Sequence, residues 1–143
     1  MLNTILVALD VEHDPLANQV VQMLQQLRLE PTTMVILAHV IPATQTEVEI
    51  AVDRPHADLE GFPHDRIDQQ LHGYQKNLPC RSEIEIVTGE PVEEILRLAN
   101  IYKSDLILIG SRGLTGMQKI LLGSVSSQIV TDAPCSVWVV KPR

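Results

Sequence analysis

The sequence predicts an α/β fold in which helices cover both faces of a parallel sheet. Short, almost wholly apolar runs of strand length recur along the chain, and segments with apolar residues at helical spacing separate them. Such alternation implies a parallel sheet between two layers of helices, and right-handed crossovers restrict its topology. The 143 residues are enough for one core and too few for two, so we expect a single domain over residues 1–143.

The first strand and the first helix follow one another directly. Residues 4–9 (TILVAL) are apolar, as in a central strand buried on both faces, and the run ends at Asp10. Asp14 and Pro15 are typical of the N-cap and the first residue of a helix. The helix should cover about residues 15–29, where five apolar residues repeat at helical spacing: Leu16, Val20, Val21, Leu24 and Leu27.

A second buried strand is predicted at residues 33–41 (TMVILAHVI). Residues 42–63 are polar and broken by three prolines, so we expect a long loop within the domain rather than a domain boundary. A narrow apolar stripe then predicts a helix over residues 65–78. The stripe consists of Ile67, Leu71, Tyr74 and Leu78.

The third strand should lie near a sheet edge. Residues 82–89 alternate glutamate with isoleucine, which leaves one face of the strand in water. Glu90 and Pro91 open the next helix, and the acidic residues of its first turn suit the helix macrodipole. Its buried face should be formed by Val92, Ile95, Leu96, Ala99 and Tyr102.

The last third of the chain supplies two more strands. Residues 105–110 (DLILIG) are the most apolar run and should form a central strand. A helix is expected over about residues 124–132, and a final strand over residues 136–140 (SVWVV). In parallel α/β sheets, ligands bind beyond the carboxyl ends of the strands, where the strand order reverses. Asp10 and Gly110 both stand at such ends.

Composition and charge exclude several classes of function. The net charge of −7 argues against a nucleic-acid surface and against docking on anionic membrane. No apolar run approaches the roughly 20 residues of a membrane span, and no basic residue precedes the first apolar run, as it would in a signal peptide. We therefore expect a cytoplasmic protein. Cys80 and Cys135 should be reduced and mostly buried thiols, and the five histidines show no metal-ligand spacing with a cysteine.

A glycine-rich segment is the strongest candidate site. Residues 110–124 (GSRGLTGMQKILLGS) contain four glycines, two cations and three hydroxyls, ahead of a helix whose first amides can bind an anion. The segment is not a Walker A loop, because Lys119 is not preceded by glycine. A dinucleotide fingerprint should follow the first strand, where the sequence ALDVEHD has no glycine. Glycine counts alone leave open that these residues only form turns and a helix cap.

The glycine spacing resembles the nucleotide-binding signature of the universal stress protein family. Gly110 and Gly113 stand three apart, and nine residues then separate Gly113 from Gly123 and Ser124, as in the signature G-x-x-G, nine residues, G-[ST]. Segments along the whole chain are similar to the family pattern: ILVALD, AHVI, GEPVEEIL, DLILIGSRGLTG and APCSVWVVKP. The resemblance implies a Rossmann-like open five-stranded parallel sheet with strand order 3-2-1-4-5.

The resemblance also implies a site for ATP, with AMP or a cyclic nucleotide as alternatives. Asp10 would contact the ribose or the adenine. The two residues before Asp10, Ala8 and Leu9, would form a wall of the adenine pocket. The backbone of Val40 would contact the adenine edge. The helix N-terminus and its serines would hold the phosphates. The implied binding residues are Ala8, Leu9, Asp10, Val40, Ile109, Gly110, Arg112, Gly113, Gly123, Ser124, Val125 and Ser126.

Each assignment has a simpler structural alternative. Asp10 can cap the following turn, Arg112 can be an exposed loop cation, and Ser126 can bond within its own helix. Mg²⁺ commonly bridges nucleotide phosphates, although no carboxylate cluster in the sequence marks a metal site, and we assign no metal ligand.

The final strand suggests self-association. An uncovered apolar edge strand is a liability, and family dimers pair this strand across a two-fold axis, so the resemblance implies a homodimer. Val137 and Val139 should point to one side of the strand, and Trp138 and Val140 to the other. Trp138 suits either a core or an interface.

Three functions remain open at this level. The first is a cytoplasmic, nucleotide-binding, stress-response or signalling dimer with unknown protein partners. The second is an enzyme, a slow ATPase or phosphotransferase, although no general base is evident near the glycines and only distant candidates such as His39 or Glu12 remain. The third is a dimerisation module without a nucleotide. The intact glycine signature favours the first, and we assign no catalytic residue.

Overall fold

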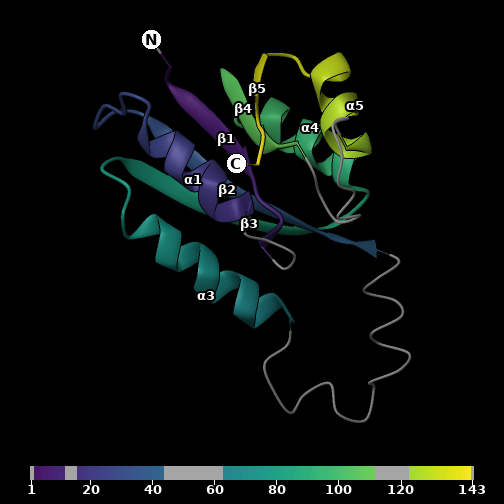
Figure 1. Cartoon of the computed structure of the whole chain (residues 1–143), viewed down its shortest axis with the longest axis horizontal. Helices are drawn as coiled ribbons and strands as arrows, with labels where there is room; N and C mark the ends of the chain where they lie inside the picture. Colours follow the sequence, from purple (N-terminus) through teal and green to yellow (C-terminus); the bar gives the residue numbers. More distant parts are fainter. Residues whose placement is uncertain (1, 12–15, 44–62, 112–122, 143) are drawn as a thin grey trace.

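Five parallel strands form one sheet in the order β3-β2-β1-β4-β5 (Figure 1). The computed structural model describes residues 2–11, 16–43, 63–111 and 123–142. The order and the α/β class confirm the sequence prediction, whereas the prediction of a single domain remains a prediction. The strands are β1 (Thr4–Ala8), β2 (Met34–Pro42), β3 (Arg81–Gly89), β4 (Leu106–Gly110) and β5 (Ser136–Val140).

The central strand β1 pairs with β2 on one side and with β4 on the other. Ala8 lies opposite Ala38 of β2 and opposite Ile109 of β4, so the three strands reach the same edge of the sheet together. Four of the five β1 residues are buried. Successive side chains of a strand point to opposite faces of the sheet. A strand buried on both faces therefore needs apolar residues at every position, which is why the sequence here is a continuous apolar run.

Two pairs of helices cover the two faces of the sheet (Figure 1). Helices α1 (Leu16–Gln25) and α3 (Pro63–Gln75) pack on one face, and α4 (Pro91–Ile101) and α5 (Ser124–Asp132) pack on the other. The alternating residues of β1 divide accordingly between two apolar clusters. Ile5 and Val7 belong to the cluster on the side of α1 and α3, and Leu6 and Ala8 to the cluster on the side of α4 and α5.

Helix α1 ends earlier than its apolar spacing predicts. The prediction extends to residue 29, but the helix ends at Gln25 because the N–H groups of Gln26 and Leu27 donate to oxygens three residues back, on Met23 and Leu24. Such bonds tighten and terminate a helix. Leu27 still packs against the core from the following turn. The predicted N-cap at Asp14 and Pro15 lies outside the described residues.

The predicted loop over residues 42–63 is described only at its ends. Pro42 is the last residue of β2, opposite Gly89 of β3, and Pro63 is the first residue of α3. Strand and helix therefore each extend to a boundary proline of the predicted loop. Residues 44–62 lie outside the described residues, so their loop character remains a prediction.

In both edge strands, β3 and β5, successive side chains point to opposite faces of the sheet, as the sequence predicts. In β3, Ile84 and Ile86 pack against the cluster on the α1 side, whereas Glu83 is exposed. In β5, Trp138 packs on the α1 side and Val137 on the side of α4. Trp138 is half-buried, so part of its side chain remains accessible on this edge strand.

Candidate functional site

A cavity of about 260 Å³ lies where the carboxyl ends of β1, β2 and β4 meet the first turn of α5. Strand order reverses here, because β2 and β4 flank β1 on opposite sides. Two residues of the predicted binding set, Arg112 and Gly113, lie outside the described residues. The structure brings the others together in the cavity wall: Ala8, Leu9, Asp10, Val40, Ile109, Gly110, Gly123, Ser124, Val125 and Ser126.

Sequence reasoning missed the parts of the wall that come from helices α1 and α4 and from the inner part of β2. The α1 residues occupy ordinary core-facing positions without a motif, whereas the others lie in the segments AHVI and GEPVEEIL that resemble the family pattern. One signal was present, because parallel pairing of the first two strands places position 38 beside the predicted Ala8. The missed residues are Leu16, Ala17, Val20, Ala38, His39, Pro91 and Ile95.

Backbone hydrogen bonds join the two ends of the glycine-rich segment. The N–H of Gly123 donates to the carbonyl oxygen of Ser111 at 2.7 Å, and the N–H of Ser111 donates to Val140 at 2.8 Å. The end of β4, the start of α5 and the end of β5 are therefore held together. This arrangement fixes the direction in which the N-terminus of α5 faces the cavity.

The hydroxyl group of Ser126 belongs to the same network. Its Oγ lies 3.2 Å from the carbonyl oxygen of Ser111 and 3.1 Å from that of Gly123, and both bonds require Ser126 to donate. Ser126 is 3% exposed. The Ser126 hydroxyl thus donates to backbone carbonyl groups and joins the first turn of α5 to the residue that follows β4.

The first turn of α5 offers backbone amides instead. Gly123 is the N-cap and has no side chain to accept their hydrogen bonds. The helical hydrogen bonds begin with the N–H of Ser127, which donates to Gly123 at 3.0 Å. The amides of Ser124 and Val125 precede that bond and lie at the positive end of the helix, which is the arrangement that binds anions.

His39 is a buried polar side chain in the cavity wall. It is 3% exposed, and its Nδ1 lies 2.8 Å from the carbonyl oxygen of Leu9. A carbonyl oxygen only accepts hydrogen bonds, so Nδ1 carries the proton. The N–H of Leu9 in turn donates to Ala38 at 2.8 Å. Both backbone groups of Leu9 are thereby tied to β2, immediately before Asp10.

Titratable side chains are few in this wall. Among the described lining residues they are Asp10 and His39. The described residues contain no group of three or more histidine, cysteine, aspartate or glutamate side chains that could hold a metal ion. The cavity is therefore mainly a hydrocarbon-walled site with a helix N-terminus at one end.

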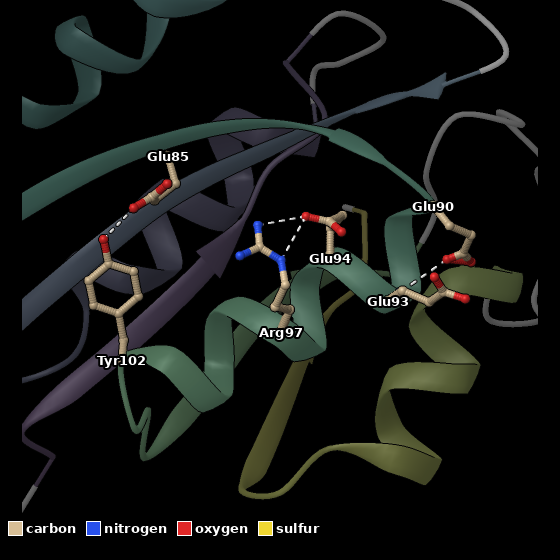
Figure 2. Close-up of polar contacts among 6 residues, drawn as sticks. All are labelled: Glu85, Glu90, Glu93, Glu94, Arg97 and Tyr102. Atoms are coloured by element: carbon tan, nitrogen blue, oxygen red, sulfur yellow. Dashed lines mark hydrogen bonds and ion pairs between the residues drawn. The ribbon is translucent and has the colours of Figure 1, made fainter.

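Figure 2 shows three polar contacts along α4, one at its start, one within it and one from the residue that follows it to β3. The hydroxyl of Tyr102 donates to Glu85 of β3, and this bond is the main reason that the pKa of Tyr102 is raised to about 12. Arg97 donates twice to Glu94, at 3.0 and 2.7 Å, which raises the pKa of the guanidinium. The carboxylate of Glu90 caps the helix by accepting from the N–H of Glu93 at 3.0 Å.

The two cysteines are free and half-buried. Burial raises the pKa of Cys80, and burial together with the negative charge of Asp105 raises the pKa of Cys135. A raised pKa suppresses the thiolate, so neither side chain is an activated nucleophile. In the described part of the chain, no helix combines the length and the apolar character that a bilayer crossing requires.

Comparison with known proteins identifies the family to which the chain is similar. A model of the universal stress protein family matches residues 1–141. The universal stress protein MJ0531 of Methanocaldococcus jannaschii is 46% identical over 57 residues, which cover 40% of this chain and 34% of that protein. A universal stress protein of Thermus aquaticus is 41% identical over 61 residues, covering 43% and 44% of the two chains. The matched segments span less than half the length of these curated relatives.

Solved structures are similar over almost the whole chain. The protein MJ0577 of Methanocaldococcus jannaschii has a TM-score of 0.80 and 26% identity, covering 99% of this chain and 96% of its own. A universal stress protein in complex with cAMP has a TM-score of 0.69 and 22% identity, covering 97% of both chains. One from Archaeoglobus fulgidus in complex with dAMP has a TM-score of 0.64 and 19% identity, covering 97% and 98%. The last two similarities establish the fold alone.

Proposed function

The chain belongs to the universal stress protein family, and on that premise we propose that it binds an adenine nucleotide at the carboxyl edge of the sheet. The observation that carries the proposal is the cavity, whose wall contains the described members of the residue set that the glycine signature implies. Its volume of about 260 Å³ lies just below the roughly 300–1,000 Å³ typical of small-molecule sites.

The two ends of the cavity suit the two ends of a nucleotide. Hydrocarbon from Ala8, Val40 and Ile109 forms a wall against which a base can pack, with the backbone of Val40 beside its edge. The amides of Ser124 and Val125 suit phosphate oxygens. Arg112 and Gly113 would complete the phosphate site from the residues outside the described ranges, and Asp10 would face the ribose.

ATP is the ligand that the glycine signature implies, with AMP and cyclic AMP as the alternatives. The complexes of two structural relatives with cAMP and dAMP support an adenine nucleotide in general and do not select among them. Mg²⁺ would accompany ATP by bridging its phosphates. Asp10 is the carboxylate among the described lining residues, so such an ion would depend mainly on phosphate oxygens and water.

We place this nucleotide-binding protein in the cytoplasm as a stress-response or signalling homodimer that associates through β5. The half-buried apolar residues of this edge strand support the dimer, since an open strand edge with apolar side chains favours pairing with a second copy. Sedimentation analysis over a range of protein concentrations tests this part. A monomer at every concentration overturns it without affecting nucleotide binding.

Calorimetric titration with ATP, AMP, cyclic AMP and NAD tests the nucleotide proposal. We expect binding of at least one adenine nucleotide, and no binding of any of them at millimolar concentration overturns the proposal. Gly123→Val places a side chain between the α5 amides and the ligand, so it should abolish binding while the fold persists. Gly73→Val on α3 is the matched control, because a side chain added there meets open space.

Measuring ATP turnover by the same protein distinguishes binding from catalysis. A binding protein leaves ATP intact over hours, because the described cavity wall offers no base beyond Asp10 and His39. Sustained ATP turnover that disappears in Asp10→Ala identifies the chain instead as a slow ATPase or phosphotransferase. Failure of Gly123→Val to weaken binding shows that the phosphates lie elsewhere.

A further inference from the structure

The two edges of the sheet differ in length and in charge. Strand β5 has 5 residues and no charged side chain, whereas β3 has 9 residues and carries Arg81, Glu83 and Glu85. β3 pairs with β2 over its whole length, and in the described part of the chain no strand pairs with its other edge. Every second residue of an edge strand directs its N–H and C=O groups away from the sheet, and such a row can pair with a strand of another chain.

The side chains of β3 present a different surface on each face of the sheet. Ile84 and Ile86 are half-buried and pack on the α1 side. Glu83 and Glu85 alternate with them and point to the α4 side, where the hydroxyl of Tyr102 donates to Glu85 (Figure 2). Glu83 is exposed and makes no hydrogen bond or ion pair with a described residue. A strand added at this edge therefore meets apolar side chains on one face and carboxylates on the other.

Charge excludes a second copy of this chain as the strand that pairs with β3. Two β3 strands paired edge to edge bring the carboxylates of one copy opposite those of the other, and like charges in that position destabilise a strand pair. The net charge of −7 adds a general repulsion. Arg97 of α4 does not remove this charge, because its guanidinium is bonded to Glu94. Lysine or arginine side chains of a different partner form favourable cross-strand pairs with Glu83 and Glu85.

We propose that the outer edge of β3 binds an extended segment of another protein, in which basic residues alternate with apolar ones, by strand addition. Main-chain hydrogen bonds supply affinity in this mode of binding, and alternate side chains supply specificity. The basic residues lie beside Glu83 and Glu85, and the apolar residues extend the surface of Ile84 and Ile86. The nucleotide cavity lies at the ends of β1, β2 and β4, so this interaction is independent of the proposed function.

The test titrates ¹⁵N-labelled protein with a short peptide of alternating lysine and valine, acetylated and amidated at its ends. The amide resonances of β3 should shift on binding, and those of β5 should stay in place. A peptide of alternating glutamate and valine should not bind. The lysine peptide N-methylated along one edge keeps its charge but cannot donate, so it should bind about 10-fold more weakly or worse. Equal binding of the methylated peptide, or no shift in β3 at millimolar peptide, overturns the proposal.

A charge reversal separates pairing at this edge from general attraction between a basic peptide and an acidic protein. Glu83→Lys replaces a favourable cross-strand pair by a repulsive one, so it should weaken the lysine peptide about 5-fold and allow the glutamate peptide to bind. Asp132→Lys is the matched control, since it makes the same change of charge at an exposed residue of α5, on the part of the fold next to β5. Equal losses in the two variants overturn the proposed docking at β3.

Hydrogen exchange of the wild-type protein tests the open edge without any substitution. In the free protein, the β3 amides that bond to β2 should exchange slowly, and the alternate amides that face away from the sheet should exchange fast. The lysine–valine peptide should slow the exchange of this second set. Slow exchange of every β3 amide before the peptide is added shows that the chain itself covers this edge, and it overturns the proposal.

Discussion

The two faces of α4 differ in burial and in the kind of contact they make. On the inner face, Ile95 and Leu98 are 4% and 2% exposed, and Ile95 also forms part of the cavity wall. On the outer face, Glu94 and Arg97 bond to each other in contact with water (Figure 2). Burial stabilises the inner residues substantially, whereas an exposed ion pair contributes little because water and salt screen it.

The comparison shows that visible polar contacts are a poor guide to what holds the site in place. The outer face carries the ion pair of Glu94 and Arg97, and the side chain of Glu90 caps the start of the helix. The inner face makes few polar contacts and supports the cavity through packing. Four substitutions along α4 sharpen this contrast, from the largest expected effect to the smallest.

Replacing Ile95 by alanine should have the largest effect. The substitution removes a buried side chain and enlarges the space beside the cavity, so it should lower the free energy of unfolding by about 2–4 kcal/mol. Urea denaturation measures the change. Glu94→Ala, one residue away on the outer face, is the control, and equal losses for the two variants contradict the division between the faces.

Loss of the N-cap should come next. Glu90→Ala removes the carboxylate that accepts from the N–H of Glu93, which should cost about 0.5–1 kcal/mol in unfolding free energy. Thermal or urea denaturation provides the measurement. Glu90→Gln keeps an acceptor oxygen and should retain most of the stability, so a glutamine variant as unstable as the alanine variant shows that charge near the helix dipole matters more than the cap.

Tyr102→Phe should have a smaller effect that depends on pH. The bond to Glu85 favours the protonated phenol and raises the pKa of Tyr102 from 10.0 to about 12 in the folded chain. Its stabilisation is therefore complete below pH 10, the unfolded pKa, and is lost as the pH rises toward 12. At neutral pH the cost in unfolding free energy should be about 0.5 kcal/mol, the low end for a hydrogen bond, because the pair is partly exposed to water.

Absorbance titration of the phenol groups checks the pKa directly. The chain has two tyrosines, and Tyr102→Phe should remove the ionisation step near pH 12. Unfolding free energies of wild type and variant should converge between pH 10 and 12. A stability difference that stays constant over this range shows that the bond to Glu85 does not distinguish the phenol from the phenolate.

Arg97→Ala should have the smallest effect of the four. The Arg97 side chain is 50% exposed, so the unfolding free energy of the variant should lie closest to that of wild type. Added salt should change it little, because little stabilisation depends on the pair. A loss comparable to that of Ile95→Ala refutes the ranking of the two faces. In that case Arg97→Lys, which keeps the charge, shows whether the two hydrogen bonds to Glu94 account for the lost stability.

Much of the cavity could be predicted because its residues sit at the ends of recognisable elements. Asp10 and Gly110 follow apolar runs of strand length, and parallel strands bring their carboxyl ends to one edge. Gly123 and Ser124 are the N-cap and the first residue of a helix, whose first amides have no acceptor within the helix. These assignments need only local patterns and the topology that alternating strands and helices impose.

Other features depend on contacts between segments distant in the sequence. The hydroxyl of Ser126 donates to the carbonyl oxygen of Ser111, fifteen residues earlier, and the sequence does not mark this pair. His39 and Leu9 are thirty residues apart, and nothing in either segment identifies the other as its partner. The walls from α1 and α4 follow from how the helices pack, not from any motif.

The sequence by itself determined the order and type of the elements, the all-parallel sheet and the strand ends at which a ligand would bind, because periodicity and the chirality of the chain act locally. Only the tertiary structure decided which side chains enclose the cavity. It also decided that Nδ1 of His39 bonds to the carbonyl oxygen of Leu9, and that the Ser126 hydroxyl donates to backbone carbonyl oxygens. Those outcomes depend on the distances and directions between segments. Only the packed sheet, with its register and its helices in place, sets them.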